Sequence, residues 1–265
     1  MDQNGYLDNV NVGDLQVERE MQKNEDLNLT EQKTYRSLVG SLNWIVQGSR
    51  PDLAFALIDL SPKLNKATVE DLVQVMKIIH RAKNEFSGVF FSHLSNLDRC
   101  QLVVFADASH GNLCNGTGSC VGFVVFLCDD KGLCCPISWR CGKARRVVKS
   151  TIAAEAMALL DGMEEAIYLR QILLEMIHLS NDKVVITCVS DHKGLVESLY
   201  STKLVEDRRL RLDVAIMKEY MEKKNIQRVF RCASSEQLAD CLTKKGADGR
   251  KLVSVLQQGK INLAL

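Results

Sequence analysis

Two aspartates each follow closely on an apolar run that is typical of a buried β-strand. In "QLVVFADASHG", residues 101–111, Asp107 comes just after Leu102–Phe105, and in "VVITCVSDHKG", residues 184–194, Asp191 comes just after Val184–Val189. Neighbouring strands lie about 4.8 Å apart, and functional groups collect at the carboxyl ends of parallel strands. If these two strands are parallel neighbours, both carboxylates emerge at one edge of the sheet, and the sequence predicts a shared acidic site.

Carboxylates held this close repel each other, and one takes up a proton unless a cation lies between them. A hard divalent cation with oxygen ligands, usually Mg²⁺, relieves the repulsion. Two further acids are placed to join the site. Glu155 lies in the first turns of a long predicted helix, and Asp240 lies in "QLADCLT" among apolar residues. For each acid alone a turn or capping role is the alternative, but four acids on four converging elements favour a common site.

The elements that carry these acids predict an α/β fold. Three strands (101–109, 119–129 and 134–143) with short turns make an antiparallel meander, and a long helix follows from Ser150 to Ile177. A strand at 184–189, two helices, a strand at 227–234 and a last helix at 235–246 complete the order βββαβααβα. This order predicts a mixed five-stranded sheet, three strands antiparallel and then parallel, with helices on both faces.

The rest of the chain predicts a small helical layer and two flanking segments. Residues 1–29 hold seven acids and two bases with few large apolar residues, which is typical of a flexible acidic leader. Residues 30–97 read as three short helices, the first beginning near Thr30 without a full capping box and the third capped by Thr68. The predicted organisation is therefore a leader at 1–29, a helical segment at 30–97, the α/β domain at 98–247 and a C-terminal tail at 248–265.

The distribution of charge predicts a segment that binds a polyanion, and the cysteines predict a protein with reduced thiols. The net charge is only +1, yet "RCGKARRVVKS", residues 140–150, has five cations and no acid. Such a segment suits a polyanion, with a solvated loop as the alternative. No apolar run approaches the length of a membrane span, and the polar N-terminus does not resemble a secretory signal. The ten cysteines show no CxxC spacing, which favours buried thiols in a reducing compartment. Within the basic segment 140–150, the candidate residues for binding a polyanion are Lys143, Arg145, Arg146 and Lys149.

Seven segments of the chain form an ordered set of motifs. They are "DAS" at 107–109, "GFVVFL" at 122–127, "PISWR" at 136–140, "RRVVKSTIAAEAMALLDG" at 145–162, "VSDHKGLVESLYSTK" at 189–203, "RRLRLDVAIMKE" at 208–219 and "QLADCLTKKGA" at 237–247. Together they resemble the RNase H domain of copia-type LTR retrotransposon Pol polyproteins. A further stretch, "YRSLVGSLNWIVQGSRPDLAFAL" at 35–57, resembles the segment that joins reverse transcriptase to RNase H in these polyproteins, so the resemblance spans roughly residues 31–260.

The resemblance implies an RNase H-like fold and a metal-dependent endonuclease that hydrolyses the RNA strand of RNA/DNA hybrids during reverse transcription. It implies that Asp107, Glu155, Asp191 and Asp240 are the catalytic acids and hold two Mg²⁺ ions, with Mn²⁺ as an alternative, for in-line phosphodiester hydrolysis. The basic residues at 143–149 would hold the nucleic-acid backbone. The implied partner is the reverse transcriptase part of the same polyprotein, and no membrane is involved. The expected location is cytoplasmic, in a virus-like particle, or nuclear, and the chain is not expected to be secreted. The oligomeric state is undetermined.

Two departures from the family pattern keep alternatives open. Relatives often carry a histidine in the loop before the last acid, but here that loop is "RCASSEQ", residues 231–237, where Glu236 is the candidate to substitute in part. The chain also lacks a polymerase "YxDD"-like motif, so it resembles the tail of a polyprotein. The first alternative is an inactive remnant that acts as a nucleic-acid or protein binding module. The second keeps the fold and changes the substrate, as in integrase or resolvase relatives.

Overall fold

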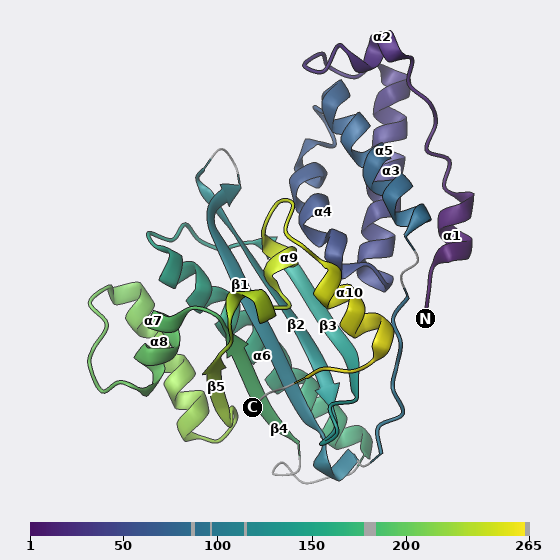
Figure 1. Cartoon of the computed structure of the whole chain (residues 1–265). Helices are drawn as coiled ribbons and strands as arrows, with labels where there is room; N and C mark the ends of the chain where they lie inside the picture. The colour runs from purple at the N-terminus through teal and green to yellow at the C-terminus, as the bar shows by residue number, and fades with distance from the viewer. Residues whose placement is uncertain (86–87, 96, 114–115, 178–183, 263–265) are drawn as a thin grey trace. The chain divides into compact units, whose positions relative to one another are not determined.

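The structure is a computed structural model that describes residues 1–85, 88–95, 97–113, 116–177 and 184–262. The chain divides after Val89 into two units, Met1–Val89 and Phe90–Leu265 (Figure 1). The division falls before the predicted domain start at residue 98. All four candidate acids lie in the second unit. The first unit contains α1 (Asn4–Asn9), α2 (Val17–Glu20), α3 (Leu29–Gly48), α4 (Ala54–Leu60) and α5 (Val69–Asn84), with short 3₁₀ turns at Pro51–Leu53 and Ser61–Lys63.

The two long helices of the first unit begin with capping boxes. Asn28 accepts hydrogen bonds from the backbone N–H groups of Thr30 and Glu31, and the Glu31 carboxylate accepts one from the Asn28 N–H. The predicted start near Thr30 without a full box is therefore wrong, because Asn28 has an acid at the third helical position. Helix α5 has the same arrangement between Thr68 and Asp71. The helices α3 and α5 pack on each other, and their apolar stripes are buried: Leu38, Leu42, Ile45, Leu72, Val75 and Ile79.

The acidic N-terminal segment carries local structure. Its composition predicts a flexible leader, whereas the structure has α1 and α2 in contact with α5. Leu7 and Val12 are buried, and the terminal ammonium group of Met1 donates a hydrogen bond to the carbonyl oxygen of Val89. A few apolar anchors in a polar segment are enough for such docking, although they are too sparse to give a periodic sequence signal.

The second unit is built on the mixed five-stranded sheet that the sequence predicts. The strand order is β3-β2-β1-β4-β5, with β1 antiparallel to β2, β2 antiparallel to β3, and β4 parallel to both β1 and β5. The strands that carry the two aspartates are therefore parallel neighbours, paired up to Phe105 opposite Val189. The strands are β1 (Gln101–Leu113), β2 (Gly118–Cys128), β3 (Cys134–Lys143), β4 (Val185–Ser190) and β5 (Arg228–Arg231).

Helices cover both faces of this sheet (Figure 1). The long helix α6 (Thr151–Ile177) lies on one face, together with α7 (Lys193–Tyr200) and α8 (Arg208–Glu222), and α9 (Asp240–Thr243) and α10 (Arg250–Gln258) lie on the other. Within the ranges that the structure describes, no helix is both long and apolar enough to cross a membrane.

The C-terminal part differs from the prediction in two ways. The helix predicted at 235–246 is only a 3₁₀ turn at Ser234–Glu236 and the four-residue α9, because the chain becomes extended at Gln237 between them. The segment predicted as a tail contains α10, which buries Leu252 and Leu256 and ends at Gly259 in a left-handed conformation with φ 61°. Two buried leucines in a short polar helix give only a weak periodic signal.

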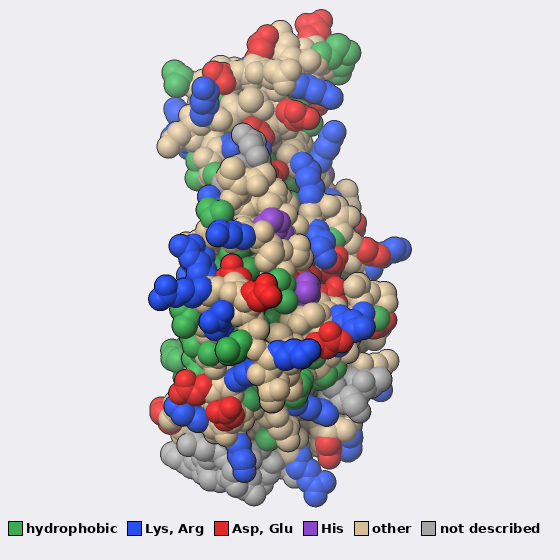
Figure 2. All heavy atoms as spheres, turned by 90° about the vertical axis from the view of Figure 1, so that its left-hand side faces the viewer, with side chains coloured by type: hydrophobic (Ala, Val, Ile, Leu, Met, Phe, Trp, Pro, Cys, Tyr) green, Lys and Arg blue, Asp and Glu red, His purple; other side chains and the backbone are tan. Residues whose placement is uncertain are grey.

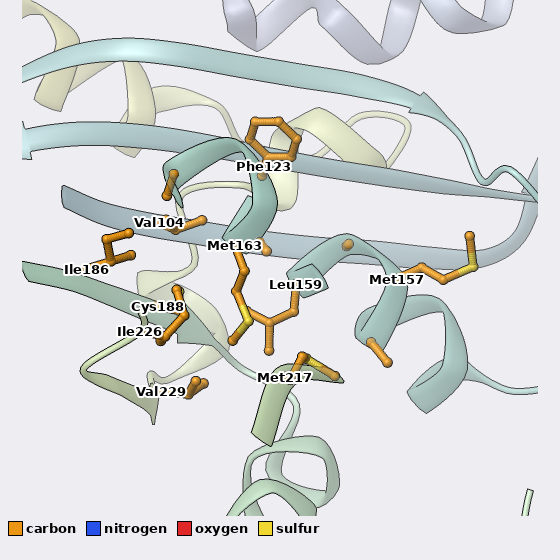
Figure 3. Packing of buried hydrophobic residues seen from close by; sticks show 14 of the residues in the cluster. Val104, Phe123, Met157, Leu159, Met163, Ile186, Cys188, Met217, Ile226 and Val229 are labelled. Atoms are coloured by element: carbon orange, nitrogen blue, oxygen red, sulfur yellow. The ribbon is translucent and has the colours of Figure 1, made fainter. Parts of the chain in front are cut away.

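The core on the α6 face fixes the long helix against the sheet (Figure 3). Leu159 and Met163 from α6 are fully buried and pack among strand residues such as Val104, Phe123 and Ile186. A Cβ added at Gly162 would lie 2.8 Å from Val104 Cγ1, so only glycine allows this close approach of helix and strand. The tight packing holds the helix, and with it Glu155, at a defined distance from β1.

Candidate active site

Three acids predicted from the sequence meet at one edge of the sheet. One carboxylate oxygen each from Asp107, Glu155 and Asp191 lies within 4.8 Å of the others. Asp107 is fully enclosed, Glu155 is buried, and Asp191 is partly exposed. The parallel pairing of β1 with β4 brings the two aspartates together, and α6 supplies the glutamate from the face beside them.

Asp107 lies inside its strand. The sequence interpretation placed it at the carboxyl end of the strand instead. The pairing of β1 with β4 ends at Phe105, but β1 continues to Leu113 along β2, with Asp107 opposite Gly122. The predicted strand stops at residue 109 and misses the last four residues of β1, because residues 109–113 are largely polar. Asp107 thus lies just beyond the point where β4 stops pairing with β1. Its backbone is still held by pairing with β2.

Glu155 is positioned by the start of α6. The Ser150 hydroxyl accepts a hydrogen bond from the Ala153 N–H, and the Ser150 carbonyl oxygen accepts one from the Ala154 N–H, which fixes the first turn. The carboxylate of Glu155 accepts a backbone hydrogen bond from Ala108, the residue after Asp107.

Burial and mutual repulsion raise the pKa values of two of these acids. Burial, with the nearby charges of Asp107 and Asp191, raises the pKa of Glu155 to about 9. Burial also raises the pKa of Asp107 to about 6, against the hydrogen bond from Thr243 and the positive charge of Lys244. Asp107 is the more enclosed of the two but has the lower pKa, because these two neighbours stabilise its ionised form.

The donor set fits a hard divalent cation. Asp107 Oδ1 and Glu155 Oε2 are both buried, and neither has a hydrogen-bond partner among the described residues. Unsatisfied buried carboxylate oxygens are rare and call for an explanation such as an ion. All the converging ligands are oxygens, which Mg²⁺ and Mn²⁺ prefer over softer metals. The geometry and the unsatisfied oxygens together make this cluster a candidate metal centre.

Asp240 is linked to the cluster through a lysine and is not one of the three converging acids. It begins α9, and its carboxylate accepts a hydrogen bond from Lys244. The Lys244 Nζ lies 3.5 Å from Asp107 Oδ1, and the Thr243 hydroxyl donates a hydrogen bond to Asp107 Oδ2. Sequence reasoning missed both residues. The available signal is their spacing in "DCLTK", three and four residues after Asp240, which places them one helical turn from the acid.

Glu236, the candidate substitute for the missing loop histidine, lies outside the acid cluster. Its carboxylate is bound by Lys251 of α10, and its side chain is 63% exposed. It is therefore held on the surface of the C-terminal helix, and nothing in its position supports a part in proton transfer at the acids.

Acids balance part of the charge of the predicted basic segment. Arg145 Nη2 lies 3.5 Å from Asp161 Oδ1, and Arg146 is hydrogen-bonded to Asp213 of α8. Arg146 and Lys149 also line a hollow of about 310 Å³ with Arg208 and Arg209 at the start of α8. Lys143 ends β3. Figure 2 shows the side of the molecule on which α7 and α8 lie, where Lys and Arg side chains are numerous with acids among them.

Comparison with curated proteins finds relatives among transposon polyproteins. The chain is 27% identical over 220 residues to the retrovirus-related Pol polyprotein from transposon RE1 of Arabidopsis thaliana, covering 82% of this chain and 14% of that protein. It is 27% identical over 214 residues to the corresponding protein from transposon RE2, covering 79% and 14%. The chain thus spans about a seventh of the length of these relatives. They confirm the predicted resemblance to a transposon Pol polyprotein. No family model matches the chain.

Solved structures similar to the chain include RNase H proteins. The N-terminal RNase H domain of rv2228c from Mycobacterium tuberculosis matches 60% of this chain and 96% of its own length, with 16% identity and a TM-score of 0.39. LC11-RNase H1 in complex with RNA/DNA hybrid matches 54% of this chain and 93% of its own, with 15% identity and a TM-score of 0.39. The prototype foamy virus protease–reverse transcriptase matches 68% and 23%, with 11% identity and a TM-score of 0.34.

Proposed function

We propose that the second unit of this chain is a metal-dependent endonuclease that hydrolyses the RNA strand of RNA/DNA hybrids, as the RNase H part of a copia-type Pol polyprotein. The observation that carries the proposal is the convergence of Asp107, Glu155 and Asp191 within 4.8 Å, with two buried oxygens that accept no hydrogen bond from the described residues. The retrovirus-related Pol relatives support the context of reverse transcription.

Asp107, Glu155 and Asp191 would hold two Mg²⁺ ions, with Mn²⁺ as an alternative, and Asp240 would share in binding one of them. Such a pair of ions supplies charge stabilisation for in-line phosphodiester hydrolysis without a covalent protein nucleophile. Other residues of this chain would hold the carboxylates of Asp107 and Glu155 in position. Thr243 holds one oxygen of Asp107, and the other accepts no hydrogen bond from the described residues. The close packing at Gly162 holds the helix that carries Glu155.

The substrate would be held through its backbone by the basic segment. Lys143, Arg145, Arg146 and Lys149 precede α6, the helix that carries Glu155, so backbone contacts there would lie next to the acids. Phosphate contacts of this kind position a duplex without reading its sequence. Choice of the RNA strand would depend on contacts to 2′-hydroxyls in the wide minor groove. The reverse transcriptase part of the same polyprotein would deliver the hybrid.

A cleavage assay with matched substrates tests this function. The full chain is incubated in Mg²⁺ with RNA/DNA hybrid, double-stranded RNA and double-stranded DNA of one sequence, beside the variants Asp107→Asn, Glu155→Gln, Asp191→Asn and Asp240→Asn. We expect cleavage of the hybrid's RNA strand only, no cleavage by the first three variants, and a smaller loss in Asp240→Asn. Full activity in Asp107→Asn would show that the acids do not form the active site.

A catalytically inactive binding module is the second candidate, because the described loop before Asp240 contains no histidine and Glu236 is tied to Lys251. This candidate predicts that the wild-type chain binds the hybrid but leaves it intact in both Mg²⁺ and Mn²⁺. Measuring hybrid binding and cleavage on the same samples separates the two functions.

A further inference from the structure

A lysine that sequence reasoning did not single out lies among the candidate metal ligands. The Lys244 ammonium is hydrogen-bonded to Asp240 and lies 3.5 Å from Asp107 Oδ1. It also acts electrostatically on Glu155 and Asp191. A single cation therefore faces all four acids, and its side chain is partly exposed, at 41%, so the ammonium has room to move.

The oxygen nearest to Lys244 is one that a metal ion would use. The other oxygen of Asp107, Oδ2, is occupied by the Thr243 hydroxyl, whereas Oδ1 accepts no hydrogen bond from any described residue. The ammonium at 3.5 Å neutralises this oxygen without satisfying it as a hydrogen-bond acceptor. A divalent cation at the acids and the ammonium of Lys244 would consequently compete for the same carboxylate.

The backbone that carries Lys244 is fixed against the sheet. A Cβ at Gly122 would lie 3.0 Å from both Leu242 Cβ and Thr243 Cγ2, so α9 packs directly on β2. The Asn112 side-chain amide donates a hydrogen bond of 2.7 Å to the Thr243 carbonyl oxygen. Lys244 thus begins from an anchored position, and only its flexible side chain is free to respond to charge in the cluster.

We propose that Lys244 is the resident counter-ion of the acid cluster and that a divalent cation must displace its ammonium group from Asp107 in order to bind. The inference rests on the metal-dependent function proposed above and deepens it. In the metal-free chain Lys244 offsets the repulsion among the acids. During metal binding the same charge opposes the incoming cation, so Lys244 weakens metal affinity while it stabilises the empty cluster.

The test measures metal binding and stability without substrate. The affinity of the full chain for Mg²⁺ alone is measured by calorimetry at pH 8, and the melting temperature is measured with and without Mg²⁺. Lys244→Met removes the charge and keeps the length of the side chain. We expect its Kd for Mg²⁺ to fall about tenfold, the scale of one unit charge acting on a divalent ion at a solvated site. We expect its metal-free melting temperature to fall as well.

Matched variants separate this role from a structural one. Lys244→Arg keeps the charge and should behave as the wild type. Lys33→Met makes the same charge change at an exposed position of the first unit and should leave both measurements unchanged. Lys244→Gln, which retains a donor for Asp240, serves if the methionine variant does not fold. An unchanged or weaker Mg²⁺ affinity in the neutral variants overturns the proposal, because a merely structural lysine would lower the melting temperature alone. A wild-type chain that binds no Mg²⁺ overturns the proposed function itself.

Discussion

At the scale of single residues, Glu155 couples the stability of the metal-free chain to pH. Its pKa in the folded chain is about 9, against an ordinary value of 4.5, so the folded state binds more protons than the unfolded state between these values. Stability therefore falls as the pH rises through this window. Asp107, with a pKa of about 6 in the folded chain, adds a smaller fall between its ordinary value of 3.8 and pH 6.

We predict that Glu155→Gln stabilises the metal-free chain at alkaline pH. The amide removes the charge that burial disfavours, so the gain should be on the order of several kcal/mol near pH 9 and should vanish near pH 4, where the carboxyl is protonated in both states. Denaturant unfolding at a series of pH values in chelator measures it, with Glu164→Gln, an exposed position on the same helix, as the control. A gain that does not vary with pH would mean that the carboxylate of Glu155 is not buried.

At the scale of elements, the docking of α9 on β2 controls the geometry of the site. Asp240, Thr243 and Lys244 all reach the cluster from this four-residue helix or its end, and Gly122 is the point where α9 meets the strand. We predict that Gly122→Ala, whose Cβ would lie 3.0 Å from Leu242 and Thr243, destabilises the second unit by about 1–3 kcal/mol and reduces the rise in melting temperature with Mg²⁺.

The matched control for this substitution is Gly142→Ala on the neighbouring strand, because the nearest atom to its added Cβ is Arg140 Nε at 3.8 Å. Gly142→Ala should leave both the unfolding free energy and the Mg²⁺ response close to the wild type. Equal effects of the two alanines would show that the close approach at Gly122 does not position α9.

The basic segment before α6 is predicted to control substrate affinity. Replacing Arg145, Arg146 and Lys149 together by alanine should weaken hybrid binding and flatten its salt dependence, by about 0.9 in the slope of log affinity against log salt for each lost phosphate contact on B-form DNA. The total should be below the sum for three contacts, because Asp161 and Asp213 already pair with the two arginines. Binding titrations at several salt concentrations measure the slope, and an unchanged slope would place the substrate elsewhere.

At the scale of the whole molecule, the parts that the sequence predicted are those with strong local signals. The strand order follows from long apolar runs and short turns. Asp107 and Asp191 follow from their positions after two of these runs, and Glu155 from its place near the start of the long helix. The capping of α3 by Asn28, the extension of β1 beyond Ser109, the helix α10 and the proposed role of Lys244 were not predicted. The Asn28 cap has a local signal, an acid at Glu31 three residues on. The other three features depend on contacts among polar or sparsely apolar residues, which leave little periodicity to read.

The division of the chain after Val89 predicts that Phe90–Leu265 folds on its own and retains the site. Its first residues hold α10, because the Phe90 N–H donates a hydrogen bond to the Leu256 carbonyl oxygen at 2.7 Å and the Ser92 hydroxyl donates one to the Gly259 carbonyl oxygen at 2.6 Å. A fragment that starts at residue 98 lacks these contacts and should melt at a lower temperature.

We expect the fragment 90–265 to melt cooperatively, to bind Mg²⁺ and to cleave hybrid at a rate close to that of the full chain, because the first unit contains none of the four acids. Calorimetric melting and the hybrid cleavage assay on the full chain, on 90–265 and on 98–265 provide the comparison. If 90–265 melts cooperatively and binds Mg²⁺ but does not cleave, then residues 1–89 must contribute to the substrate groove. In that case the helical unit would act in catalysis by holding the hybrid, although it supplies no acid.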